Sequence, residues 1–253
     1  QLKQLSSIKR DERLFRSASL LAEAQLQVNK RAAAIATIED LMKLAISLPS
    51  GNLYKLARFR LAGLDPSLDV FKTLQQFARE GSALSHYPPE IVAVQWIDQQ
   101  PTKLAQLRGR VVLLDFWAPW CGPCRYTFPK LQKWHESYKD QGLLILGLTN
   151  YYGIVEGRDL TPAEELTYLR EFKKRNHLPY GFVVADSSVN DRNYGAYTLP
   201  MSFLIDRRGN VRFIAVGASD QETNALGKMI KQLIAEPAPE AQATSGKTST
   251  TNQ

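Results

Sequence analysis

Two cysteines separated by two residues, Cys121 and Cys124, are the side chains of this sequence best suited to covalent chemistry. They are the only cysteines among 253 residues, which excludes a disulfide scaffold and a four-cysteine zinc site. If the pair opens a helix, its spacing brings the two sulfurs within disulfide reach. The helix N-terminus would also favour a thiolate at Cys121, because unpaired N–H groups and the helix dipole stabilise negative charge there. An isolated pair with this spacing can also be half of a metal site, so its surroundings decide its meaning.

The residues on either side of the pair predict a strand followed by a helix. Val111–Phe116 is a nearly continuous apolar run, as expected of a strand buried on both faces. Helical periodicity runs from Cys121 to about Tyr138, and Pro123 suits the first turn because its missing N–H is not needed there. A cysteine pair in this position indicates redox chemistry much more strongly than an isolated pair does.

Strands and helices alternate over residues 88–236. Further strands are expected at 91–96, 143–148, 182–185, 202–206 and 211–216, with helices opening at the caps Thr161 and Ser219. This order predicts an α/β domain in which a mixed sheet carries helices on both faces. Residues 237–253 are rich in Pro, Ala, Ser and Thr without hydrophobic periodicity, and they predict a disordered tail.

Residues 1–87 predict a separate all-α module of helical hairpins. Apolar residues recur at helical spacing over 14–22 and 35–45, a third helix is expected at 53–62, and a fourth should begin after the N-cap Asp65 and stop near Gly81. The pattern matches tetratricopeptide repeats only loosely, and a plain helical bundle explains it equally well. The module has no catalytic constellation, so we interpret it as an interaction or spacer module.

Composition and charge exclude several other classes of protein. Hydrophobic residues make up 44% and charged residues 23% of the chain, which is typical of globular proteins. No apolar run reaches the roughly 18 residues of a membrane span. The net charge of +7 is spread over the chain, and the densest basic run, 173–175, complements the end of a predicted helix. We therefore expect no nucleic-acid partner.

The segment Asp115–Cys124, which reads DFWAPWCGPC, resembles the active-site segment of thioredoxin. Pro129 matches the helix-kinking proline of that family, and the run Thr198, Leu199, Pro200 resembles the segment that carries its cis-proline. With Tyr194-Gly195 and residues 203–209, these motifs are most similar to the TlpA/ResA-like thiol-disulfide oxidoreductases. The resemblance covers residues 88–236 and implies a thioredoxin fold for them.

The resemblance implies a role for each residue of the site. Cys121 would be the nucleophile, and Cys124 would resolve the mixed disulfide. Asp115, with a pKa raised by burial, would exchange a proton with Cys124; its alternative is to cap a nearby backbone group. Pro200, if cis, would face the cysteines and leave the backbone of Leu199 free to pair with an extended substrate.

Two aromatic regions are expected beside the thiols. Trp120 should cover them, whereas Trp117 should pack in the core. Residues 151–161 form a longer connection than most relatives need, and they should emerge at the same sheet edge as Cys121. We expect this segment, with Tyr151 and Tyr152, to form one wall of the substrate groove; the alternative is a plain surface loop.

Other chemistries fit the sequence less well. A copper-delivery protein of similar fold would need a C-x-x-x-C pair and a histidine, and of the three histidines only His177 precedes a strand of this domain. A peroxidase would use one cysteine without a close partner. Thr127 and Asp115 stand where relatives that serve cytochrome c maturation often carry Glu and Asn, which argues against a dedicated maturation role. We expect no metal and no cofactor.

We therefore expect the protein to be a thiol-disulfide oxidoreductase that reduces disulfides of partner proteins and is itself reduced again by an upstream electron donor. Gly122-Pro123 resembles the pair found in reducing members of the family. The alternative is a binding or assembly protein whose helical module recruits a partner and whose redox site is secondary. The resemblance implies an extracytoplasmic location, periplasmic or tethered through a segment removed before Gln1, although the sequence leaves a cytoplasmic location open.

Overall fold

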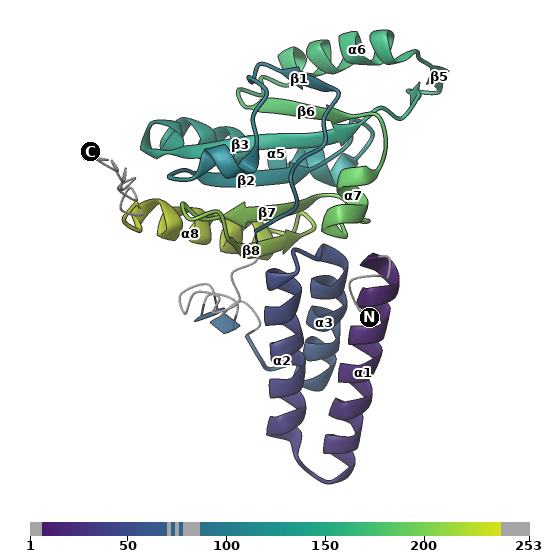
Figure 1. Cartoon of the computed structure of the whole chain (residues 1–253), viewed down its shortest axis with the longest axis vertical. Coiled ribbons are helices and arrows are strands. Elements are labelled where there is room, and N and C mark those ends of the chain that lie inside the picture. Colours follow the sequence, from purple (N-terminus) through teal and green to yellow (C-terminus); the bar gives the residue numbers. More distant parts are fainter. Residues whose placement is uncertain (1–6, 70–71, 74–75, 78–86, 239–253) are drawn as a thin grey trace, which may run out of the picture.

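Helices make up the N-terminal part of the protein as far as the structure describes it (Figure 1). The computed structural model describes residues 7–69, 72–73, 76–77 and 87–238. Helices α1 (Ser7–Gln27), α2 (Arg31–Ser47) and α3 (Gly51–Leu64) pack against one another. Helix α3 starts two residues earlier than expected, because the Ser50 side chain caps it by accepting a hydrogen bond from the Leu53 N–H. Half of the expected fourth helix and residues 239–253 of the expected tail lie outside the described residues.

A six-stranded mixed sheet forms the centre of the rest of the chain, as predicted. Its strand order is β1-β6-β3-β2-β7-β8, with β2, β3 and β6 parallel to one another and the other three strands antiparallel to their neighbours. The strands are β1 (Gln95–Ile97), β2 (Val111–Phe116), β3 (Leu143–Asn150), β6 (Gly181–Ala185), β7 (Met201–Ile205) and β8 (Val211–Val216).

The strand expected at 91–96 was placed too early. It begins only at Gln95, because the side-chain amide of Asn190 takes both backbone groups of Val92. That amide accepts from the Val92 N–H at 3.0 Å and donates to the Val92 carbonyl at 2.7 Å. Contact with the neighbouring strand β6 therefore starts only after Val92: the Val94 N–H donates to the Val184 carbonyl at 2.9 Å, and Gln95 is the first residue of the strand.

Helices cover both faces of the sheet. On one face lie α5 (Gly122–Tyr138), α6 (Pro162–Arg175) and α8 (Asp220–Ala235), joined by the Phe128–Phe172 ring contact and the Lys130–Asp220 ion pair. On the other face the short helix α7 (Val189–Tyr194), which the sequence did not predict, inserts Tyr194 against two phenylalanines of the sheet. Short 3-10 helices lie at Leu104–Leu107 and Lys139–Gln141.

The three N-terminal helices lie beyond the β8 edge of the sheet, with the end of α3 that begins at Gly51 directed toward it (Figure 1). A Cβ atom added to Gly51 would lie 2.0 Å from the sulfur of Met201, the first residue of β7. Arg58 of α3 also forms a 2.5 Å ion pair with the buried Glu222 of α8. Buried apolar residues of both parts form one continuous core. The division at residue 87 and the tetratricopeptide likeness stay predictions.

The contact at Gly51 predicts that the helices stabilise the sheet. Gly51→Val should lower the free energy of unfolding by about 1–3 kcal/mol, because the added side chain overpacks the site against Met201. All four tryptophans lie at positions 96–134. Tryptophan fluorescence during guanidinium unfolding therefore reports on the sheet and α5, and not on the N-terminal helices.

Gly63→Val is the matched control, because it lies in the same helix with no atom within 4 Å of an added Cβ. Its effect should stay within about 0.5 kcal/mol. If Gly51→Val moved the circular dichroism transition but not the fluorescence transition, the helices would not support the sheet.

Candidate active site

The chain segments expected at the site meet at one edge of the sheet. The parallel strands β2, β3 and β6 all end there, and β7 starts there, since Phe116 pairs with Met201 and Asn150 pairs with Ala185. The segments 117–121, 151–153 and 198–200 therefore emerge side by side. His177, the histidine considered for copper, precedes β6 and so lies at the opposite edge.

Cys121 and Cys124 form a disulfide at the N-terminus of α5, with their Cα atoms 5.3 Å apart. Cys121 is the N-cap, and its sulfur accepts a hydrogen bond from the Cys124 N–H at 3.2 Å. Cys124 is fully buried, whereas 4% of Cys121 is exposed. The helix start thus offers N–H donors to Cys121, which favours its thiolate when the disulfide is reduced.

The loop before the disulfide is held by α5 itself. The Arg125 guanidinium donates two hydrogen bonds to the Pro119 carbonyl, at 2.8 and 3.2 Å, and packs over the ring of Phe172. The Thr127 hydroxyl donates to the Cys124 carbonyl at 2.8 Å. The sequence did not single out Arg125 for this function, because a basic residue in a first helical turn carries no signal of its own.

Asp115 points to the face of the sheet that α5 and α6 cover. It lies in a cross-strand row with Ser202, Gly147 and Phe182, and partners in such a row share one face. The Trp117 indole lies over Gly147, where an added Cβ would come within 2.9 Å of its nitrogen. Trp117 is buried against rings of α5, α6 and β6, as expected of a core residue.

Burial raises the pKa of Asp115 to about 7, and a hydrogen bond from Ser202 counteracts part of that rise. The carboxyl group is 1% exposed. The Ser202 hydroxyl donates to Oδ1 of Asp115 at 2.8 Å, and Oδ2 has no hydrogen-bond partner among the described residues. Sequence reasoning missed Ser202, because its position opposite Asp115 depends on the register between β2 and β7.

The peptide bond between Leu199 and Pro200 is cis. The Pro200 carbonyl accepts a hydrogen bond from the Gly217 N–H at 2.9 Å, which ties this segment to the end of β8. Within the described residues, no hydrogen bond uses the backbone N–H or carbonyl of Leu199. The structure thus leaves these two groups available at the edge where Cys121 lies.

The segment 151–161 is an ordered hairpin beside the disulfide loop. It contains β4 (Ile154–Val155) and β5 (Arg158–Asp159). The buried carboxylate of Glu165, on α6, accepts hydrogen bonds from the N–H groups of Tyr152 and Gly153 at 2.9–3.1 Å. The Tyr152 ring meets the ring of Trp120, with centroids 5.4 Å apart.

Tyr151 and Trp120 differ in what they expose. The Tyr151 N–H donates to the Ala185 carbonyl at 2.9 Å and so continues the pairing of β3 with β6. Trp120 is 62% exposed. The contact between Trp120 and Tyr152 therefore places an aromatic surface next to Cys121. In the described part of the chain, no group of three or more His, Cys, Asp or Glu side chains is arranged to hold a metal ion.

The mixed sheet has this strand order, a cysteine pair opens the helix after β2, and a cis-proline precedes β7. These features together define the class of thioredoxin-fold thiol-disulfide oxidoreductases. A family model described as Redoxin matches residues 89–230. The chain belongs to the redoxin family, and the match excludes the N-terminal helices.

Curated relatives support the same class. Thiol-disulfide oxidoreductase ResA of Geobacillus kaustophilus is 31% identical over 122 residues, 47% of this chain and 62% of ResA. Thiol:disulfide interchange protein DsbE of Pseudomonas aeruginosa is 32% identical over 136 residues, 53% of this chain and 67% of DsbE. Protein DipZ of Mycobacterium bovis is 32% identical over 143 residues, 55% of this chain. The chain spans only 19% of DipZ and less than two thirds of ResA.

Solved structures agree on the fold. The crystal structure of a thioredoxin-like superfamily protein superposes with a TM-score of 0.51 at 25% identity, covering 60% of this chain and 99% of that one. The solution structure of a thioredoxin-like protein in the oxidized form gives a TM-score of 0.50 at 21% identity, covering 60% of this chain and 97% of that one.

The raised pKa of Asp115 predicts a pH-dependent stability. The pKa of about 7 lies above the ordinary value of 3.8 for an aspartate, so the folded protein binds more protons than the unfolded one between these values, and stability falls as pH rises through that window. Asp115→Asn removes this titration. Its stability relative to wild type should therefore increase by about 2–3 kcal/mol from pH 5 to pH 9.

Urea unfolding of both oxidised proteins across this pH range measures the difference, in which the other titrating groups cancel. A difference that did not depend on pH would show that Asp115 does not titrate near neutrality.

Proposed function

We propose that the protein reduces disulfides of partner proteins with the Cys121–Cys124 dithiol. The observation that carries this function is the cysteine pair at the start of α5, with the N-cap sulfur of Cys121 beside helix N–H groups and Cys124 buried beneath it. The Cys121 thiolate attacks one sulfur of the substrate disulfide, which forms a mixed disulfide and releases the first substrate thiolate to take up a proton. Cys124 then attacks Cys121, which releases the second substrate thiol and leaves the protein oxidised.

Asp115 is the proposed proton acceptor for Cys124. Its carboxyl faces α5, the helix that carries Cys124, and its pKa of about 7 lets it accept a proton near neutral pH. Among the described residues, the hydrogen bond to the Asp115 carboxyl comes from a side chain, that of Ser202. This supports proton transfer over the alternative in which Asp115 caps a backbone group. Burial raises the pKa of Tyr180 well above its usual value. The negative charge of the nearby Asp115 raises that pKa further.

Pro200, Leu199 and the aromatic pair form the proposed substrate contacts. The unused backbone groups of Leu199 would pair with an extended substrate strand. Trp120 and Tyr152 would contact the substrate on the other side of Cys121, and the backbone of Tyr151 would hold that wall in place. The fixation of the hairpin by Glu165 supports a wall instead of a mobile loop.

The direction, location and partners are part of the same proposal. Gly122-Pro123 between the cysteines supports reduction, with electrons supplied by an upstream donor. We propose an extracytoplasmic site of action, by analogy with ResA and DsbE. In the described residues, none of the helices combines the length and apolarity that a membrane span requires.

A second function is assembly through the N-terminal helices. The family match begins at residue 89, so the three helices are an addition to the redoxin domain. Under this alternative they would recruit a partner protein, and the redox site would be secondary.

Replacing the nucleophile tests the main proposal. Cys121→Ser should reduce insulin, in the presence of dithiothreitol, no faster than dithiothreitol alone, because the attacking thiolate is gone. Cys124→Ser should instead accumulate a mixed disulfide that non-reducing gels resolve. Turbidity from precipitating insulin chains gives the rate, and a wild-type rate equal to that of Cys121→Ser would refute the reductase function.

Replacing Asp115 tests the proton transfer. Asp115→Asn should slow resolution of the mixed disulfide by about 100-fold near pH 7 and by progressively less at higher pH, where hydroxide increasingly replaces the carboxylate as proton acceptor. Rapid-quench kinetics with a preformed mixed disulfide measure this step. Ser202→Ala is the matched control: it keeps the carboxyl, loses the hydrogen bond that lowers the pKa of Asp115, and should move the inflection of the wild-type profile to higher pH. Identical profiles for all three proteins would return Asp115 to a structural role.

A further inference from the structure

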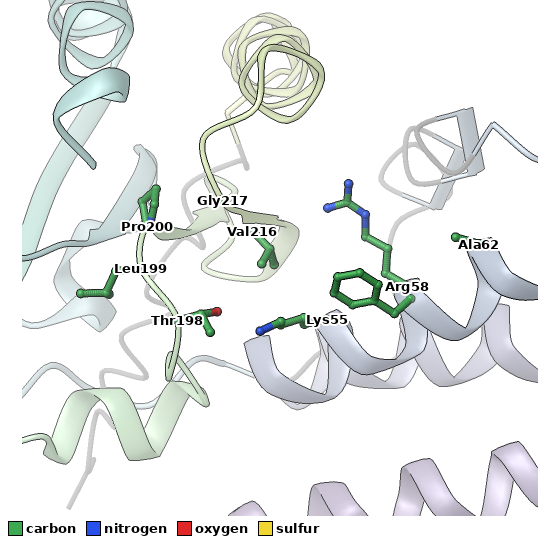
Figure 2. A pocket seen from close by; sticks show the side chains of 9 residues that line it. Lys55, Arg58, Ala62, Thr198, Leu199, Pro200, Val216 and Gly217 are labelled. Atoms are coloured by element: carbon green, nitrogen blue, oxygen red, sulfur yellow. The ribbon is translucent and has the colours of Figure 1, made fainter. Parts of the chain in front are cut away.

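A cavity of about 350 Å³ separates helix α3 from the cis-proline segment (Figure 2). One side of it belongs to the redoxin domain and the other side to the N-terminal helices. Figure 2 shows Lys55 and Arg58 on the helix across from the segment that carries Pro200. The lining residues are Thr198, Leu199, Pro200, Val216 and Gly217 from the domain, and Lys55, Arg58, Phe59 and Ala62 from α3.

The helical side of this cavity is held rigidly against the sheet. The start of α3 is packed on Met201, the residue after the cis-proline. An added Cβ at Gly195, just before the cis-proline segment, would lie 3.1 Å from the backbone nitrogen of Asn52. The ion pair between Arg58 and Glu222 anchors the middle of the helix to α8. The distance between α3 and Pro200 is thus fixed by packing at several points.

The domain side of the cavity holds unused hydrogen-bonding groups. The backbone of Leu199 has no partner within the described residues. The Thr198 hydroxyl oxygen is buried and also lacks a hydrogen-bond partner in the part of the chain that the structure describes. A substrate strand that pairs with Leu199 would satisfy groups at the cavity wall, and its neighbouring side chains would then extend into the cavity toward α3.

The helical side of the cavity combines one available cation with apolar surface. The charge of Arg58 is compensated by Glu222. Lys55 makes no ion pair in the described part of the chain. Phe59 is 70% exposed, which is unusual for a phenylalanine. This surface suits a segment that carries an acidic side chain next to an apolar one.

We propose that helix α3 forms a second wall of the substrate groove and selects disulfides whose cysteine is flanked by an acidic and an apolar residue. The inference rests on the proposed reductase function, and it assigns to the N-terminal helices the choice among substrates. The volume of about 350 Å³ accommodates one or two side chains of an extended chain.

The test uses the reduced full-length chain and synthetic ten-residue peptides. Each peptide carries one cysteine as a mixed disulfide with thionitrobenzoate. Either Glu or Lys, with Leu beside it, is placed in turn at each of four positions before and four positions after that cysteine. Release of thionitrobenzoate gives kcat/KM for each peptide. Wild type should favour Glu over Lys about five-fold at one or two adjacent positions, and about 0.5 M salt should remove most of this preference.

Three variants assign the preference to the cavity. Lys55→Glu should abolish or invert the ratio between Glu and Lys peptides, and Lys55→Gln should bring it close to one. Phe59→Ser should raise KM for all the peptides, because each carries Leu and the variant removes the apolar contact for it. Lys30→Glu, which makes the same charge change at the exposed N-cap of α2, is the matched control and should keep the wild-type ratio.

The outcomes separate this inference from the function on which it rests. If wild type fails to reduce even dithiobis(nitrobenzoate), the reductase function is wrong. If it reduces that disulfide but shows equal rates for Glu and Lys peptides, or if Lys55→Glu keeps the preference, α3 does not select substrates. A concentration-dependent dimer in sedimentation velocity that Lys55→Glu dissociates would show that a second copy fills the cavity, and would also overturn the inference.

Discussion

The burial of one carboxyl group, that of Asp115, is the constraint on which the site depends. Strand β2 is buried along its whole length, so this group lies where water does not reach it and where its charge is costly. A single hydrogen bond from Ser202 compensates it only in part, and its pKa consequently rises to about 7. The same strand leads through a short loop into α5, and this places the dithiol on the face of the sheet to which Asp115 points. One element thus fixes the positions of both the proposed proton acceptor and the thiols.

The arrangement of the sheet explains why the remaining site residues converge. Parallel pairing sends the ends of β2, β3 and β6 to one edge, and antiparallel pairing of β7 with β2 returns the cis-proline to that edge. Small residues make the packing possible on each face: Gly147 leaves room for the Trp117 indole on one side, and Gly51 leaves room for Met201 on the other. The site is therefore built by the core, and its loops follow from strand directions.

The sequence was sufficient to predict most of the sheet, the three N-terminal helices and the cysteine pair, because apolar runs, caps and the C-x-x-C spacing are local signals. It misplaced β1, because Asn190 captures the backbone of Val92 from almost a hundred residues away along the chain. Ser202 was missed because its place opposite Asp115 depends on the pairing of β7 with β2. Glu165 was missed because its hydrogen bonds to the N–H groups of Tyr152 and Gly153 depend on how the hairpin folds back on α6. The position of α3 beside Pro200 is also a tertiary fact. The roles of Asp115, Pro200, Trp120 and the tyrosines stay predictions that the geometry supports.

The two sides of Cys121 differ in origin, and this difference separates chemistry from selection. The dithiol, Asp115 and Pro200 all lie within the residues that the family model matches, so under the proposed function the matched region carries the disulfide exchange. Helix α3 lies outside that match, yet packing against Met201 and the ion pair with Glu222 hold it across a cavity from the cis-proline. A wall fixed by packing adds contacts at little entropic cost, because no loop has to be ordered when a substrate binds. An added module of this kind changes which disulfides reach the thiols while the residues that exchange them stay the same.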